Sequence, residues 1–199
     1  MESTLDYTKL CIYCFQVLEN FLSNKEIDNI PFPEEFKGKS YPLFVTWRIG
    51  KGKGKEKELR GCIGTFSKDN LEKNLMRYTF SSAFKDSRFP PISKNEVKYL
   101  SCEVSLLDHF EKANSPVDWV IGKHGIDIDF DDQKGKNYSA TYLPHVAEKE
   151  NWDHETTLKH LIRKAGYKGT LESVYKNIEV TRYQSIKTAL SYQEYENRK

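Results

Sequence analysis

The sequence has 199 residues, with 31 lysines and arginines against 29 aspartates and glutamates, a formal net charge of +2. This near balance argues against a strongly cationic nucleic-acid-binding protein, and an aromatic content of 13% argues against a disordered chain. No apolar run reaches the ~18 residues of a membrane span, and no export signal opens the chain, so we expect a folded cytoplasmic and nuclear protein without membrane contact.

The first predicted element is a helix that carries two of the four cysteines. Apolar residues from Leu10 to Phe21 recur at helical spacing, which places Cys14 in the core and Cys11 near the edge of the apolar face. The two thiols form a CxxC pair, but no second pair of ligands lies at similar spacing. We therefore expect no metal site, and nothing in the sequence indicates a cofactor.

Two strands with a glycine-rich tip follow. Leu43–Ile49 and Leu59–Phe66 are rich in β-branched and aromatic residues and predict a hairpin. Between Arg48 and Arg60 the chain has six basic and only two acidic side chains. A solvated loop is the simpler interpretation of this tip, and nucleic-acid contact through Lys51–Lys57 is the alternative.

A helix and a third strand come next. The segment Asp69–Glu72 is typical of a capping box and predicts a helix through Phe84, ending before Pro90. Alternating polarity in Leu100–Leu106 then predicts a half-buried strand, with Glu103 on the face turned away from the core.

The remaining third of the chain predicts a second hairpin, a helix and a last strand. Ile126–Phe130 and Tyr138–Tyr142 alternate in polarity and end at Pro144. Leu158–Ala165 has a helical apolar stripe, and Ile178–Tyr183 is typical of a strand. The order of elements indicates an α+β domain with a largely antiparallel sheet flanked by helices.

The most unusual segment for chemistry surrounds Cys62. Its thiol lies between Gly61 and Gly64 and close to Arg60. Exposed main-chain N–H groups and a guanidinium both favour the thiolate, which is the nucleophilic form. The alternative is a small thiol packed beneath a tight strand, since free cysteine is among the most buried residue types.

A nucleophilic Cys62 requires a base. His124 and His145 are the candidates, although nothing in the spacing places either beside the thiol, and a hydrogen-bonded structural histidine is the alternative for each. Glu103 and Tyr142 lie on strand faces that could line a cleft. A plain surface carboxylate and a packed aromatic ring are the corresponding alternatives.

Six segments occur in order along the chain: LRGCIGTF (59–66), SAFKDSRFPP (82–91), CEVSLL (102–107), GKHGIDIDF (122–130), ATYLPHVA (140–147) and TLKHLIRKAGY (157–167). Together they resemble the AMMECR domain family, named for a human chromosomal region of Alport syndrome, midface hypoplasia and elliptocytosis. The DSRFPP form and the closing TRYQS stretch favour its eukaryotic branch. The resemblance implies one domain over residues 1–199, with a core at about 5–185, a tail at 186–199 and two unequal lobes forming a cleft.

The resemblance leaves the activity open, including whether the protein is an enzyme. It implies a functional LRGCIG motif, which gives these catalytic candidates: Cys62, His124, His145 and Glu103. The binding candidates are Arg60, Gly61, Gly64 and Tyr142. One hypothesis is a thiol-dependent enzyme or enzyme subunit acting on a small molecule, nucleotide or protein, with Arg60 binding an anionic group. The other is a non-catalytic regulatory or scaffold module that binds a protein partner or nucleic acid.

Overall fold

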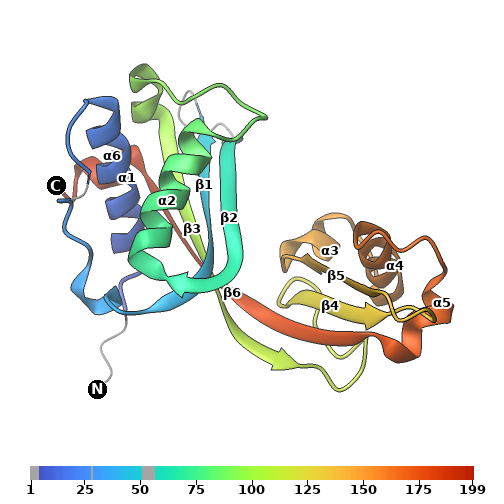
Figure 1. Cartoon of the computed structure of the whole chain (residues 1–199). Helices are drawn as coiled ribbons and strands as arrows, with labels where there is room; N and C mark the ends of the chain where they lie inside the picture. The colour runs from blue at the N-terminus through green and yellow to red at the C-terminus, as the bar shows by residue number, and fades with distance from the viewer. Residues whose placement is uncertain (1–4, 28, 51–56) are drawn as a thin grey trace. The chain divides into compact units, whose positions relative to one another are not determined.

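The computed structural model describes residues 5–27, 29–50 and 57–199. Figure 1 shows a mixed α/β chain, whose contacts divide it into two compact units. The larger unit extends to Leu106 and takes in Ile186–Lys199, and the smaller is Leu107–Ser185. The strand order is β2 (Glu58–Asn70), β1 (Ser40–Ile49), β3 (Leu100–Lys112), β6 (Glu179–Ser191), β4 (Gly125–Asp131) and β5 (Asn137–Tyr142), with antiparallel pairing inside each unit. The α+β fold with an antiparallel sheet flanked by helices is confirmed.

The first unit packs helices against one face of its part of the sheet. Its elements are α1 (Thr8–Leu22), η1 (Glu34–Phe36), β1 (Ser40–Ile49), β2 (Glu58–Asn70), α2 (Leu71–Phe84), η2 (Lys94–Tyr99), the first part of β3 (Leu100–Lys112), the last part of β6 (Glu179–Ser191) and α6 (Tyr192–Glu196). Alternate residues of β1, including Val45 and Trp47, are fully buried. The Trp47 ring packs on Phe15 of α1 at 5.3 Å, and its Nε1 donates to the Thr79 carbonyl of α2 at 3.5 Å.

Three of the four cysteines lie in this core. Cys14 and Cys102 are fully buried as expected, and Cys11, expected near the edge of its helix face, is fully buried as well. The Thr79 hydroxyl donates to the Cys14 sulfur at 3.1 Å. The CxxC pair therefore packs as two small apolar residues of α1, which leaves Cys62 as the half-buried thiol.

Two boundaries differ from those expected. The N-cap of α2 is Asn70 rather than Asp69, because the Asn70 side chain accepts the Lys73 amide at 3.0 Å. Residues 186–199 are not a tail outside the core, since β6 continues to Ser191 and α6 buries Tyr195 against Phe15 with stacked rings at 4.9 Å.

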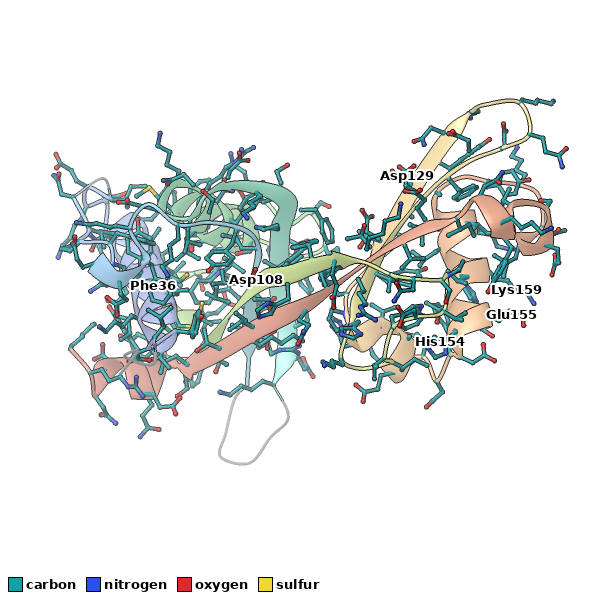
Figure 2. All side chains as sticks on the ribbon, turned by 90° about the horizontal axis from the view of Figure 1, so that it is seen from below. Phe36, Asp108, Asp129, His154, Glu155 and Lys159 are labelled. Atoms are coloured by element: carbon teal, nitrogen blue, oxygen red, sulfur yellow. The ribbon has the colours of Figure 1, made fainter. Side chains whose placement is uncertain are left out.

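The second unit packs helices against its own part of the sheet and has a separate core. Its further elements are β4 (Gly125–Asp131), β5 (Asn137–Tyr142), α3 (His145–Lys149), α4 (His154–Lys164), α5 (Leu171–Val174) and η3 (Tyr175–Asn177). Along β4 buried Ile126, Ile128 and Phe130 alternate with exposed aspartates. Figure 2 labels one of these, Asp129, together with Glu155 and Lys159 of α4.

None of the helices in the described ranges is both long and apolar enough to cross a bilayer. This agrees with the sequence, where no apolar run approaches the length of a span.

Candidate functional site around Cys62

The two glycines of the LRGCIG motif lie where another chain segment approaches closely. A Cβ at Gly61 would lie 2.0 Å from the Ser82 carbonyl oxygen of α2. At Gly64 it would lie 2.2 Å from the Leu43 carbonyl oxygen and 2.5 Å from the Phe44 ring. The structure thus gives each glycine a packing role, and their role as binding residues stays a prediction.

The main chain of Cys62 is held by the loop after α2. Its amide donates to Asp86 Oδ2 at 2.9 Å, and its carbonyl accepts from Arg88 Nη2 at 3.2 Å. Since β2 is the first strand of the sheet order, these two groups belong to its free edge. The loop therefore occupies the backbone hydrogen-bonding groups of Cys62 at the edge of the sheet, where a further strand would otherwise pair.

Asp86 and Arg88 form a closely bonded pair. Arg88 donates from Nε to Oδ1 at 2.9 Å and from Nη2 to Oδ2 at 2.7 Å. The guanidinium, with a smaller contribution from the Cys62 amide, holds the pKa of the Asp86 carboxyl far below its usual range. The Asp86 side chain is buried, whereas that of Arg88 is 55% exposed.

Arg60 has a different role from the one expected. The register of β1 and β2 shifts between Trp47 and Arg48, which pair with Gly61 and Leu59. Arg60 is therefore the extra residue of a β-bulge and has no pairing partner on β1. Its guanidinium donates to both carboxylate oxygens of Glu96, at 2.8 and 3.2 Å, and to two proline carbonyls at positions 90 and 91. Arg60 is only 7% exposed, and its hydrogen bonds connect the LRGCIG motif to the DSRFPP loop. The exposed guanidinium beside Cys62 is that of Arg88.

The Cys62 thiol lies in a polar row that crosses three strands. In register, Cys62 of β2 opposes Thr46 of β1, and Thr46 opposes Glu103 of β3. The Thr46 hydroxyl donates to the Cys62 sulfur at 3.1 Å. This row lies on the sheet face opposite the Trp47 side chain, as side-chain alternation requires.

The surroundings of the thiol favour its neutral form. Burial raises the pKa of Cys62, and the charges of Asp86 and Glu103 raise it further. The Thr46 hydrogen bond and the Arg88 guanidinium lower the pKa, but the net direction is upward. The thiolate interpretation of Cys62 is therefore disfavoured over the packed thiol. The two groups named in its support bond elsewhere, since the Cys62 amide donates to Asp86 and the Arg60 guanidinium pairs with Glu96.

His124 lies in the second unit and has a bonded, buried ring. Its Nδ1 accepts the Val120 amide at 2.9 Å, and the side chain is 6% exposed. Burial, with the charges of Lys123 and Arg182, lowers the pKa of the imidazole. The lone pair that a general base would use is thus occupied by a backbone N–H, which favours the structural alternative for His124.

The other two candidates of the second unit lie at the end of β5 and just after it. Tyr142 is half-buried, with Lys164 Nζ 4.5 Å from its ring centroid, and burial raises the pKa of its phenol. His145 is exposed at the start of α3. The candidates thus divide by unit: Cys62, Arg60, both glycines and Glu103 in the first, and the two histidines and Tyr142 in the second.

Sequence reasoning missed the residues that hold the motif in place. They are Thr46, Asp86, Arg88 and Glu96. The DSRFPP segment contributes to the family resemblance, but the resemblance implies no role for it. The Asp-Ser-Arg spacing in this segment is the signal that could have identified Asp86 and Arg88. Among the described residues, no group of three or more histidine, cysteine or acidic side chains is arranged to hold a metal.

The basic tip lies mostly outside the described residues. Residues 51–56 are not described, so the alternative of nucleic-acid contact through Lys51–Lys57 stays a prediction. Lys57 itself is exposed and donates from Nζ to the Ser101 hydroxyl on the same face as Glu103.

Comparison with known proteins agrees with the resemblance. The AMMECR1 family model matches residues 11–188. An uncharacterized protein of Schizosaccharomyces pombe is 42% identical over 191 residues, 96% of each chain. One of Arabidopsis thaliana is 41% identical over 189 residues, covering 94% of this chain and 86% of that protein. The crystal structure of an uncharacterized Pyrococcus horikoshii protein matches with a TM-score of 0.67 and 25% identity, over 90% of this chain and 89% of that one.

Proposed function

This chain belongs to the AMMECR1 family, and from that premise we propose that it is a non-catalytic regulatory module that binds a protein partner through the sheet face around Cys62. The observation that carries the proposal is the environment of the Cys62 thiol, whose sulfur accepts from the Thr46 hydroxyl at 3.1 Å and whose pKa is raised by burial, which favours the neutral form. A thiol in this state is a weak nucleophile, because the thiolate is the reactive form.

The first unit offers Cys62 no imidazole. All five histidines of the sequence lie between positions 109 and 160, inside the second unit. The titratable groups around the thiol are Asp86, Glu103 and Arg88, and the two carboxylates oppose the thiolate. This local chemistry supports binding over nucleophilic catalysis.

The surface beside Cys62 has both apolar and polar contact groups. Phe66, two positions beyond Gly64 on β2, is 44% exposed, and its ring lies 5.2 Å from that of Phe44 on β1. Arg88 makes no hydrogen bond through Nη1 to any described residue, so it can donate to a partner. We therefore expect the partner segment to place an apolar side chain against Phe66 and a carboxylate against Arg88.

A protein partner fits this face better than nucleic acid does. Glu103 adds a carboxylate to the face, and a carboxylate repels phosphate. The exposed Phe66 ring is an apolar contact of the kind typical of protein interfaces.

The test is site-specific photo-crosslinking in cells with benzoylphenylalanine at position 66 and, as the matched control, at exposed Tyr175 of the second unit. The protein crosslinked only from position 66 is then purified and titrated with the unmodified chain. We expect Arg88→Glu to weaken binding about tenfold or more, and Cys62→Ser to retain it. Equal binding by the Arg88 variant would contradict the proposal.

A thiol-dependent enzyme is the second candidate. It is supported by the half-buried position of Cys62 and by the Arg88 guanidinium, which lowers the pKa of the thiol in part. This candidate requires a Cys62 pKa below the ~8.5 of a free cysteine, and loss of activity on Cys62→Ser.

A further inference from the structure

A second site of ligand size lies in the first unit, away from the LRGCIG strand in sequence. It is a cavity of about 620 Å³ between the C-terminal end of α1, the η2 turn and the start of α6. Figure 1 shows α6 beside α1, in agreement with their contacts. Pockets of roughly 300–1,000 Å³ are typical of small-molecule sites.

The η2 wall of the cavity is fixed before any ligand binds. Glu96 accepts from the Ser93 amide and hydroxyl at 2.9 Å each, which closes a capping box at the start of η2. The same carboxylate is held by the Arg60 guanidinium. This bonding fixes the turn that carries Lys94, Lys98 and Tyr99.

The opposite walls are fixed as well. Beyond α1, the Lys25 amide donates to the Asn20 carbonyl at 2.8 Å, and Asn20 Nδ2 donates to the Glu26 carbonyl at 3.0 Å. At the start of α6, the Tyr192 hydroxyl donates to Glu19 at 2.9 Å. The cavity is therefore preformed, which lowers the entropic cost of binding.

The charges around the cavity are unbalanced. Its two carboxylates are already compensated, Glu96 by Arg60 and Glu19 by Lys199 at 3.0 Å. Three lysines also line it: Lys25, Lys94 and Lys98. Among the described residues, none of these three ammonium groups has a carboxylate within ion-pair distance. The cavity thus presents uncompensated positive charge, which attracts an anion.

Aromatic and apolar side chains complete the lining. Tyr99 and Tyr192 both line the cavity, and Lys98 Nζ lies 5.0 Å from the Tyr99 ring centroid. Leu22 and Val97 add apolar surface. Tyrosine rings next to lysine ammonium groups suit a ligand that joins a planar ring to a phosphate, since the ring can stack while the lysines bind the anion.

We propose that this cavity binds a phosphorylated nucleoside, with its base against Tyr99 or Tyr192 and its phosphates on Lys94, Lys98 and Lys25. The proposal is independent of the protein-binding function proposed for the Cys62 face, because it uses none of that face's contact residues.

The test is calorimetric titration of the full chain with ADP at low salt, with adenosine and pyrophosphate as separate probes. We expect ADP to bind more tightly than either fragment. Lys94→Gln/Lys98→Gln should raise the ADP Kd about tenfold or more, because two charge-assisted contacts are lost. Lys73→Gln, an exposed lysine of α2 outside the cavity, is the matched control and should leave the Kd unchanged.

An amide NMR titration with ADP locates the site. We expect shifts in η2, at the end of α1 and at Tyr192. The proposal is overturned if ADP does not bind, if pyrophosphate binds as tightly as ADP, if the double lysine variant retains the affinity while folded, or if the shifts gather around Cys62 and Arg88 instead. A second variant, Lys25→Gln, tests the same charge from the other wall, and an unchanged ADP Kd there contradicts the role given to Lys25.

Discussion

The main-chain amide of Cys62 donates to Oδ2 of Asp86 at 2.9 Å, across a separation of 24 residues. This contact, with that of Arg60 to the carbonyl of Pro90 at 2.8 Å, joins the LRGCIG strand to the DSRFPP loop. The two motifs therefore form one rigid structure, in which the polar contacts of the backbone around Cys62 are satisfied inside the protein.

Asp86→Ala removes the acceptor of the Cys62 amide and the partner of Arg88. We expect a loss of ~1–3 kcal/mol in the free energy of unfolding, because a buried carboxylate with several bonds is lost. Hydrogen exchange of the Cys62 amide should accelerate. Asp69→Ala at an exposed position is the control, and equal effects of both variants in urea unfolding would show that the contact contributes nothing specific.

Gly61→Ala tests the packing role of the motif glycine. The added methyl would lie 2.0 Å from the Ser82 carbonyl oxygen, so α2 must shift from β2. We expect a destabilisation of about 2 kcal/mol or more, measured by urea unfolding. Gly50→Ala is the matched control, since the nearest atom to its new methyl belongs to the flexible Lys57 side chain. A fully stable Gly61→Ala variant would rule out the packing explanation.

Acid should weaken the brace between Arg60 and Glu96. The guanidinium lowers the pKa of Glu96 from 4.5 to about 2, so the folded state binds fewer protons than the unfolded state between these values. The contribution of this pair is therefore present above pH ~4.5 and is lost as pH falls toward 2. In Glu96→Gln the unfolding free energy should be lower at pH 7 and should fall less between pH 5 and pH 3. A parallel acid dependence in both proteins would contradict this.

His124 should remain neutral at physiological pH, with its proton on Nε2. Its Nδ1 accepts the Val120 amide, and burial lowers its pKa below the usual ~6.5. Because the pKa is lowered on folding, the stabilising contribution of this residue is present above pH ~6.5 and declines as pH falls toward the folded value. Imidazole nitrogen NMR measures both tautomer and pKa, and a proton on Nδ1 would refute the assignment.

The elements followed from the sequence more readily than their contacts did. Alternation predicted the buried and exposed faces of β4. On the strand carrying Glu103 it predicted the core face correctly, but the expected solvated face is wrong, because Ser101 and Ser105 are buried there as well. The bond between Cys62 and Asp86 could not be predicted, because periodicity describes one element and this bond joins an edge strand to a loop. Tyr195 is buried by a five-residue helix too short to show a pattern.

The site differed from expectation mainly at Arg60. Two positions before Cys62 on a regular strand, its side chain would lie on the same face as the thiol. The register shift between Trp47 and Arg48 interrupts that alternation, and Glu96 accepts the guanidinium. A bulge of this kind depends on the register between two strands, and the sequence of one strand does not determine that register.

The central claim is that Cys62 is a neutral thiol in a binding face. Its direct test is the rate of iodoacetamide alkylation of Cys62 from pH 6 to pH 10, followed by peptide mass spectrometry so that the three buried cysteines are read separately. Burial and the Asp86 and Glu103 charges predict a Cys62 pKa above the ~8.5 of a free cysteine, with slow labelling at pH 7. Rapid labelling at pH 7 with a pKa below that value would contradict the binding module and favour the thiol-dependent enzyme.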